Sequence, residues 1–177
     1  MLLFFRLLML LLLAVVYLQD MRYRGVSWII FSLLFVAVVA VRHFSGQSLA
    51  VVGESLLVNM GVLTVILSLL ILYLLLKHLR FVNITEQYLG WGDIFFFLIL
   101  ALYLSVLNFL FFFVVSLLFT GVCHAVFVGF NKDKYIPLAG FQALLLMLLL
   151  AADWWYFHLG VMDDYWLLRY YMSWIQV

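Results

Sequence analysis

The chain has 177 residues, of which 70% are hydrophobic and 10% are charged, and its mean hydropathy is +1.29. Because a soluble domain typically has about 25% charged residues, this composition excludes an ordinary soluble protein and indicates an integral membrane protein. The formal net charge is only +1 and the basic residues are scattered, which argues against nucleic-acid binding.

Apolar runs separated by short polar breaks predict six membrane-spanning helices, since one span needs roughly 20 apolar residues. The expected helices cover approximately residues 2–18, 26–41, 55–76, 93–107, 109–130 and 136–157. The fourth and fifth are divided at Asn108, the only turn signal in an apolar stretch that is too long for one span. The predicted fold class is therefore an all-α integral membrane bundle.

The two ends of the chain carry different signals. No Ala-x-Ala-like cleavage site follows the first apolar run, so we expect a permanent first helix rather than a cleaved signal peptide. Residues 158–177 carry Asp163, Asp164 and Arg169 among Trp and Tyr, which is typical of the membrane interface. We therefore expect one transmembrane domain over residues 1–157, followed by an interfacial tail.

Basic residues in the short loops set the predicted orientation, because Lys and Arg favour the cytoplasmic side. One side would carry Arg22, Arg24, Lys77, Arg80, Lys132 and Lys134. The other side would carry Arg6, Arg42 and Arg169 near its boundaries. This asymmetry predicts an external N-terminus and puts Asp20 and Asp93 on the cytoplasmic side.

Asp20 and Asp93 are acids at the edges of long apolar runs, where an ionised carboxylate is costly and favours a functional interpretation. Two carboxyl groups brought together do not both ionise easily, so one keeps a proton while the other acts as a base. Such a pair activates water against an amide carbonyl, which predicts aspartyl-protease chemistry without a metal or cofactor. Gly90 and Gly92, on either side of Trp91, leave room for a substrate backbone beside Asp93.

Three segments together resemble a known family. They are Asp20-Met21-Arg22-Tyr23-Arg24-Gly25-Val26-Ser27-Trp28, Gly90-Trp91-Gly92-Asp93 and Ile136-Pro137-Leu138-Ala139-Gly140-Phe141-Gln142-Ala143-Leu144. In this order they are similar to the first-aspartate region, the Gly-x-Gly-Asp motif and the Ile-Pro-containing segment of type IV prepilin peptidases. The resemblance covers most of the chain.

The resemblance implies a membrane aspartyl endopeptidase of the GxGD type in the bacterial or archaeal cytoplasmic membrane. Asp20 and Asp93 would share the catalytic roles, and Gly90, Gly92, Ile136 and Pro137 would line the substrate site. The substrate would be a prepilin-like or pseudopilin polypeptide of a type IV pilus or protein secretion system, cleaved after its basic leader. Longer family members also methylate the new N-terminus and carry a cysteine-rich zinc insertion. We expect no methylation here, because Cys123 is the only cysteine.

Three departures from the family pattern favour an alternative. Phe95 occupies the position of a usual Lys, Val26-Ser27 replaces an Ile-Pro pair, and Gly140 replaces the second Pro of the late segment. These changes leave both carboxylates in place but favour, as the alternative, a catalytically impaired scaffold subunit of a secretion or pilus assembly complex.

Other interpretations stay open at the level of sequence. Asp20 would be an ordinary interfacial acid if it only paired with Arg22 or Arg24, and Asp93 would be a helix-start acid favoured by the helix dipole. The Gly-x-Gly-Asp motif is also similar to that of presenilin-like proteases, although the residue before the first acid is Gln19 rather than Tyr. A small proton-coupled transporter would require both acids to be accessible from both sides of the membrane.

Overall fold

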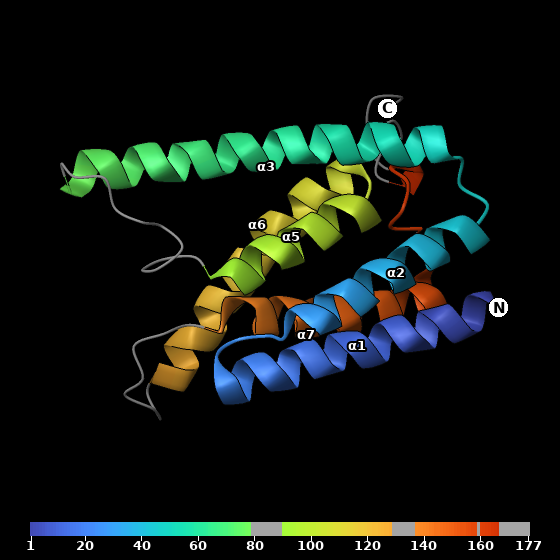
Figure 1. Cartoon of the computed structure of the whole chain (residues 1–177), viewed down its shortest axis with the longest axis horizontal. Helices are drawn as coiled ribbons and strands as arrows, with labels where there is room; N and C mark the ends of the chain where they lie inside the picture. The colour runs from blue at the N-terminus through green and yellow to red at the C-terminus, as the bar shows by residue number, and fades with distance from the viewer. Residues whose placement is uncertain (79–89, 129–136, 159, 167–177) are drawn as a thin grey trace, which may run out of the picture.

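The computed structural model of the chain describes residues 1–78, 90–128, 137–158 and 160–166 (Figure 1). The α-helices in these ranges are α1 (Leu2–Tyr23), α2 (Trp28–Phe44), α3 (Leu49–His78), α5 (Trp91–Tyr103), α6 (Val106–Val128) and α7 (Leu138–Ala152). A π-helical turn, η1 (Asp153–Phe157), continues α7. Since the described ranges hold no strand, the all-α prediction is confirmed for them.

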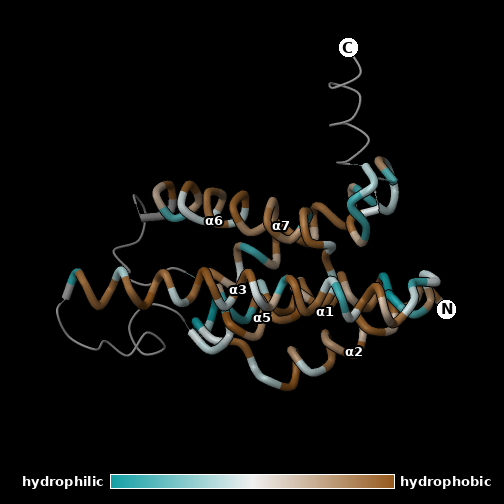
Figure 2. The backbone as a smooth tube through the Cα atoms, turned by 90° about the horizontal axis from the view of Figure 1, so that it is seen from above, coloured by the Kyte–Doolittle hydropathy of each residue, from teal (hydrophilic) through white to brown (hydrophobic). Residues whose placement is uncertain are grey.

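Four helical segments are long and apolar enough to cross a membrane: α1, α3, α6 and α7 with its π-turn. The chain is therefore a multi-pass membrane protein by length and composition. α2 and α5 have 17 and 13 residues, so they extend only about 25 Å and about 20 Å at 1.5 Å per residue. Hydrophobic residues cover most of each helix in Figure 2.

Successive described helices run in alternating directions along one long bundle (Figure 1). α1 packs against α2 and α7, and α6 packs against α7. α5 packs against α2, α3, α6 and α7, and it holds the buried run Phe96, Phe97 and Ile99–Tyr103. A helix that is apolar on all sides lies either in a protein core or in lipid, and the contacts of α5 with four other helices place this short helix in the core of the described bundle.

The C-terminal end of α5 is held by polar side chains from two neighbouring helices. The Asn59 amide of α3 donates hydrogen bonds of 2.9 Å to the carbonyl oxygens of Ala101 and Leu104. The Arg42 guanidinium of α2 donates to the carbonyl oxygen of Leu102. The last carbonyls of a helix have no partner within the helix, so these contacts satisfy groups that apolar packing would leave unpaired.

The connection between α5 and α6 differs from the prediction. The break lies at Leu104 and Ser105, and Asn108 lies within the first turn of α6 instead of in the turn itself. The amide of Asn108 donates to the carbonyl oxygens of Val161 (3.1 Å) and Asp163 (2.8 Å), and so joins α6 to residues 160–166. Asn108, which suggested a turn in the sequence, thus forms hydrogen bonds with a segment far away along the chain.

Candidate active site

Asp20 lies in the last turn of α1, with a side chain only 7% exposed. We predicted it just past the end of the first helix, but α1 continues to Tyr23 and ends at Arg24, which has a left-handed backbone conformation. The N–H of Gly140 in α7 donates a hydrogen bond of 2.6 Å to Asp20 Oδ2. The longer helix therefore directs this acid into the bundle toward α7.

Asp93 lies in the first turn of α5 and uses both of its oxygens. The N–H of Gly90, the residue before the helix, donates to Asp93 Oδ2 at 3.0 Å, which closes the helix start. The N–H of Ala139 in α7 donates to Asp93 Oδ1 at 2.9 Å. One oxygen thus serves its own helix, as expected for an acid near a helix start, and the other reaches a second helix.

The two carboxylates meet at adjacent backbone positions, because Ala139 and Gly140 follow one another in the first turn of α7. The first N–H groups of a helix lack intrahelical partners and carry the positive end of its dipole, so they favour negative charge. Asp20 and Asp93 also interact electrostatically with each other, and Arg24 interacts with Asp20. We call this region, formed by both acids and the first turn of α7, the carboxylate end; it lies on the left in Figure 1.

Gly140 is the residue that permits this approach. A Cβ built on Gly140 would lie 3.1 Å from both Cβ and Oδ2 of Asp20, closer than side chains normally pack. The family pattern has Pro here, and Pro has no N–H with which to hold Asp20. From the sequence, Gly140 was only a departure from the family pattern. In the structure its small size lets Asp20 approach, and its N–H donates a hydrogen bond to Asp20.

The other predicted site residues that the structure describes lie around this centre. Gly90 precedes α5, and Gly92 faces Phe31 of α2, with a built Cβ 3.7 Å from the ring. Pro137 is the N-cap of α7, one position before the helix, and its carbonyl accepts from the N–H of Phe141. Ile136 lies outside the described residues. Ala139 was missed as a site residue, although it stands in the segment that carried the resemblance.

The opposite end of the bundle contains a second set of buried or half-buried polar groups, which we call the arginine end. It comprises Arg42, Asn59, Ser105, Asn108 and Asp164. Asp164 Oδ1 accepts from the Ser105 hydroxyl at 2.6 Å and from the N–H of Leu107 at 3.2 Å. These contacts satisfy helix ends without bringing two like charges together. Sequence reasoning missed this set, because single polar residues inside apolar runs carry no spacing signal.

In the described ranges, no group of three or more His, Cys, Asp or Glu side chains is placed to hold a metal ion. The described chemistry at the carboxylate end is that of two carboxyl groups, backbone N–H donors and one neighbouring guanidinium. The chain matches no protein-family model, no curated protein and no solved structure. Its relation to prepilin peptidases therefore stays a resemblance carried by three motifs.

Proposed function

We propose that the protein is a membrane aspartyl endopeptidase in which Asp20 and Asp93 act as a pair. The observation that carries this proposal is the convergence of both carboxylates on the adjacent N–H groups of Ala139 and Gly140. The acids come from α1 and α5 and are far apart in sequence, so local helix formation does not require them to meet. Bringing two acids together in an apolar bundle is costly, which favours a chemical use.

The pair supports a general acid–base reaction on a peptide bond. One carboxylate takes a proton from water as the hydroxyl attacks the carbonyl carbon, and the protonated partner donates a proton to the carbonyl oxygen. Collapse of the tetrahedral intermediate breaks the C–N bond. The leaving nitrogen takes up a proton from the first carboxyl group, and a hydroxyl of the intermediate returns a proton to the second carboxylate as the new carboxyl group forms. Neither role is assigned to one residue, because protons shared between two interacting acids belong to the pair.

The substrate in this proposal is the basic leader of a membrane-anchored prepilin-like or pseudopilin polypeptide, cleaved at the cytoplasmic face of a bacterial or archaeal membrane. Support comes from the three motifs and from the excess of Lys and Arg in the loops on the side of the acids. An acidic pair at the end of the bundle also suits a leader of opposite charge.

Co-expression with tagged prepilin-like polypeptides tests the proposal. Asp20→Asn is the sharpest variant, because the amide oxygen of Asn keeps an acceptor for the Gly140 N–H but cannot exchange the proton. Asp93→Asn keeps only one of two accepted bonds, so its folding is checked in parallel. We expect leader removal to be lost in both variants while both stay folded. Continued cleavage by folded Asp20→Asn protein would reject the paired mechanism.

A scaffold subunit without catalysis is the second candidate, and a specific contact favours it. Each carboxylate already accepts a hydrogen bond from α7, so the acids are equally suited to fastening α1 and α5 to the start of that helix. In that case Asp20→Asn and the original chain would support assembly equally well. Assembly that persists in Asp20→Asn, together with no cleavage by the original chain across the substrate panel, would select the scaffold.

A further inference from the structure

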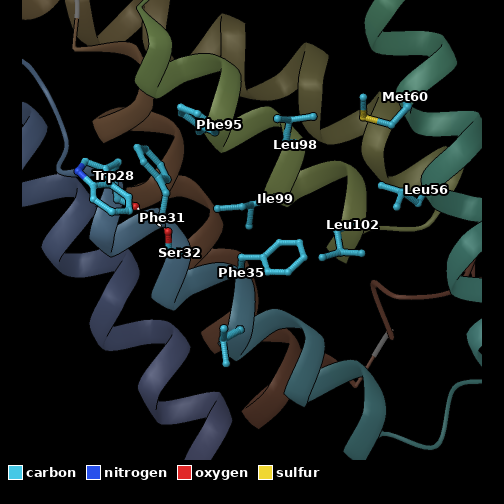
Figure 3. A pocket seen from close by; sticks show the side chains of 11 residues that line it. Trp28, Phe31, Ser32, Phe35, Leu56, Met60, Phe95, Leu98, Ile99 and Leu102 are labelled. Carbon is cyan, nitrogen blue, oxygen red and sulfur yellow. Dashed lines mark hydrogen bonds between the residues drawn. The ribbon is translucent and has the colours of Figure 1, made fainter.

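An apolar groove of about 650 Å³ runs between α2, α3 and α5 (Figure 3). α2 and α3 both pack against α5, so α5 forms the floor and the other two helices form the walls. Phe35 and Phe95 line this groove and are 51% and 43% exposed. The surface is therefore open and still unfilled by the described residues of the chain.

The groove begins beside the carboxylate end. Phe95 follows Asp93 by two positions, and its ring lies 6.0 Å from that of Phe31 across the groove mouth. Phe31 also faces Gly92, the residue before Asp93. Figure 3 shows Trp28, Phe31 and Phe95 together at one end and Leu56 and Leu102 at the other. An occupant of the groove would thus have one end next to the two acids.

The lining selects an apolar occupant of limited length. Among the described lining residues the only hydroxyl belongs to Ser32, and it already donates to the carbonyl oxygen of Trp28 at 3.1 Å. α2 lines the groove from Trp28 to Val36, a distance of about 12 Å at 1.5 Å per residue, or roughly two helical turns. These dimensions suit one apolar face of a short helical segment.

We infer that the groove binds an apolar helical segment of the polypeptide substrate and that Phe95 is a specificity-determining residue at its carboxylate end. The inference rests on the proposed function and extends it to the part of the substrate inside the membrane. The negative charge of the two acids favours a polypeptide over a phospholipid as the occupant of the groove. A lipid chain in the groove would bring an anionic phosphate toward Asp20 and Asp93, whereas a peptide brings neutral amide groups.

Photocrosslinking tests occupancy without requiring cleavage. A photoreactive phenylalanine analogue replaces Phe35 in the groove or, as a matched control, the 55% exposed Phe111 on α6. Each full-length variant also carries Asp20→Asn and is co-expressed in cells with a tagged prepilin-like polypeptide. We expect the polypeptide to be captured at position 35 several-fold more than at position 111. Adducts at position 35 that contain only lipid, or a second copy of the chain, would overturn the inference.

Kinetics of the otherwise unchanged enzyme test the role of Phe95. We expect Phe95→Ala to raise KM about tenfold with little change in kcat, because it removes apolar contact made equally before and during the reaction. Phe95→Leu should restore most of the affinity, and Phe111→Ala should change neither constant. A fall in kcat alone would reject a binding role.

The two proposals fail in different ways. If Asp20→Asn loses cleavage but position 35 captures no substrate, the peptidase proposal is supported and substrate binding in the groove is rejected. Capture at position 35, together with no cleavage by the original chain that keeps both aspartates, would support substrate binding in the groove and reject the peptidase.

Discussion

The carboxylate end and the arginine end place buried polar groups at opposite ends of the same bundle, but they combine charges differently. At the arginine end, Arg42 and Asn59 donate to carbonyl oxygens at the end of α5, so donors meet acceptors. At the carboxylate end, Asp20 and Asp93 accept hydrogen bonds from adjacent N–H groups at the start of one helix, α7. Donor–acceptor pairing accounts for most contacts of the first arrangement, although Arg42 Nη2 and Asn59 Oδ1 have no hydrogen-bond partner in the described structure. The second arrangement brings two acids into electrostatic interaction, which stability does not require.

The comparison predicts that changes at the carboxylate end alter chemistry and that changes at the arginine end alter stability. Activity per folded molecule and the free energy of unfolding are therefore measured together for each variant. Equal losses of both quantities in Asp20→Asn, which keeps the shape of the side chain, would weaken the distinction between the two ends.

The largest effect is expected from the paired acids. Asp20→Asn and Asp93→Asn should each lower the rate of leader cleavage by about a hundredfold or more, since each removes a general acid–base group. The double variant should be hardly slower than either single variant, because groups that act as a unit are not additive. Single-turnover cleavage assays measure all three. Multiplied losses in the double variant would mean that the acids act independently.

Gly140→Ala comes next, because it disturbs the approach of Asp20 without removing a carboxylate. The added Cβ would lie 3.1 Å from Asp20, so α1 or α7 has to shift. We expect a loss of about 1–3 kcal/mol in unfolding free energy from overpacking. We also expect cleavage to slow by up to about a hundredfold, because small displacements impair catalytic geometry.

Gly121→Ala is the matched control for Gly140→Ala. Gly121 lies within α6, where a built Cβ meets nothing within 4 Å. Replacing a glycine inside a helix with alanine should stabilise it by up to about 1 kcal/mol. Equal stability of the two alanine variants in detergent would contradict the close contact between Gly140 and Asp20.

Arg42→Ala tests the opposite end of the bundle. Its guanidinium donates to the carbonyl oxygen of Leu102 and, at 2.8 Å, to Gln47 Oε1, and the side chain is only 2% exposed. Losing these bonds should lower the free energy of unfolding by about 1–3 kcal/mol. Thermal unfolding in detergent measures the loss. Cleavage per folded molecule should stay unchanged, and a selective loss of cleavage would connect the two ends functionally.

Asp164→Ala is expected to have the smallest effect. Asp164 accepts from the N–H of Leu107 and the hydroxyl of Ser105 at the start of α6, so it acts as a helix cap supplied by residues 160–166. Loss of a cap lowers the free energy of unfolding by about 1 kcal/mol. Glu54→Ala, at an exposed position near the start of α3, is the control and should leave the unfolding temperature unchanged.

The sequence predicted the presence of the α-helices better than the positions at which they end. Apolar runs identified the six α-helices of the described residues, four of which are long and apolar enough to cross a membrane, because burial in hydrocarbon depends on composition along each segment. It placed the end of α1 before Asp20 and the α5–α6 turn at Asn108, since it treated polar residues as signs of a boundary. Both residues lie within helices, where partners on other segments satisfy them.

The sequence by itself determined the membrane class, the helical fold and the two acids that stand out against an apolar background. Only the tertiary structure decided that Asp20 and Asp93 share the start of α7, because partners from three helices have no fixed spacing along the chain. It also decided the use of Gly140, which depends on a neighbour 120 positions away. Side-chain periodicity reports which face of a helix is buried, whereas the identity of the group that meets it is a property of packing.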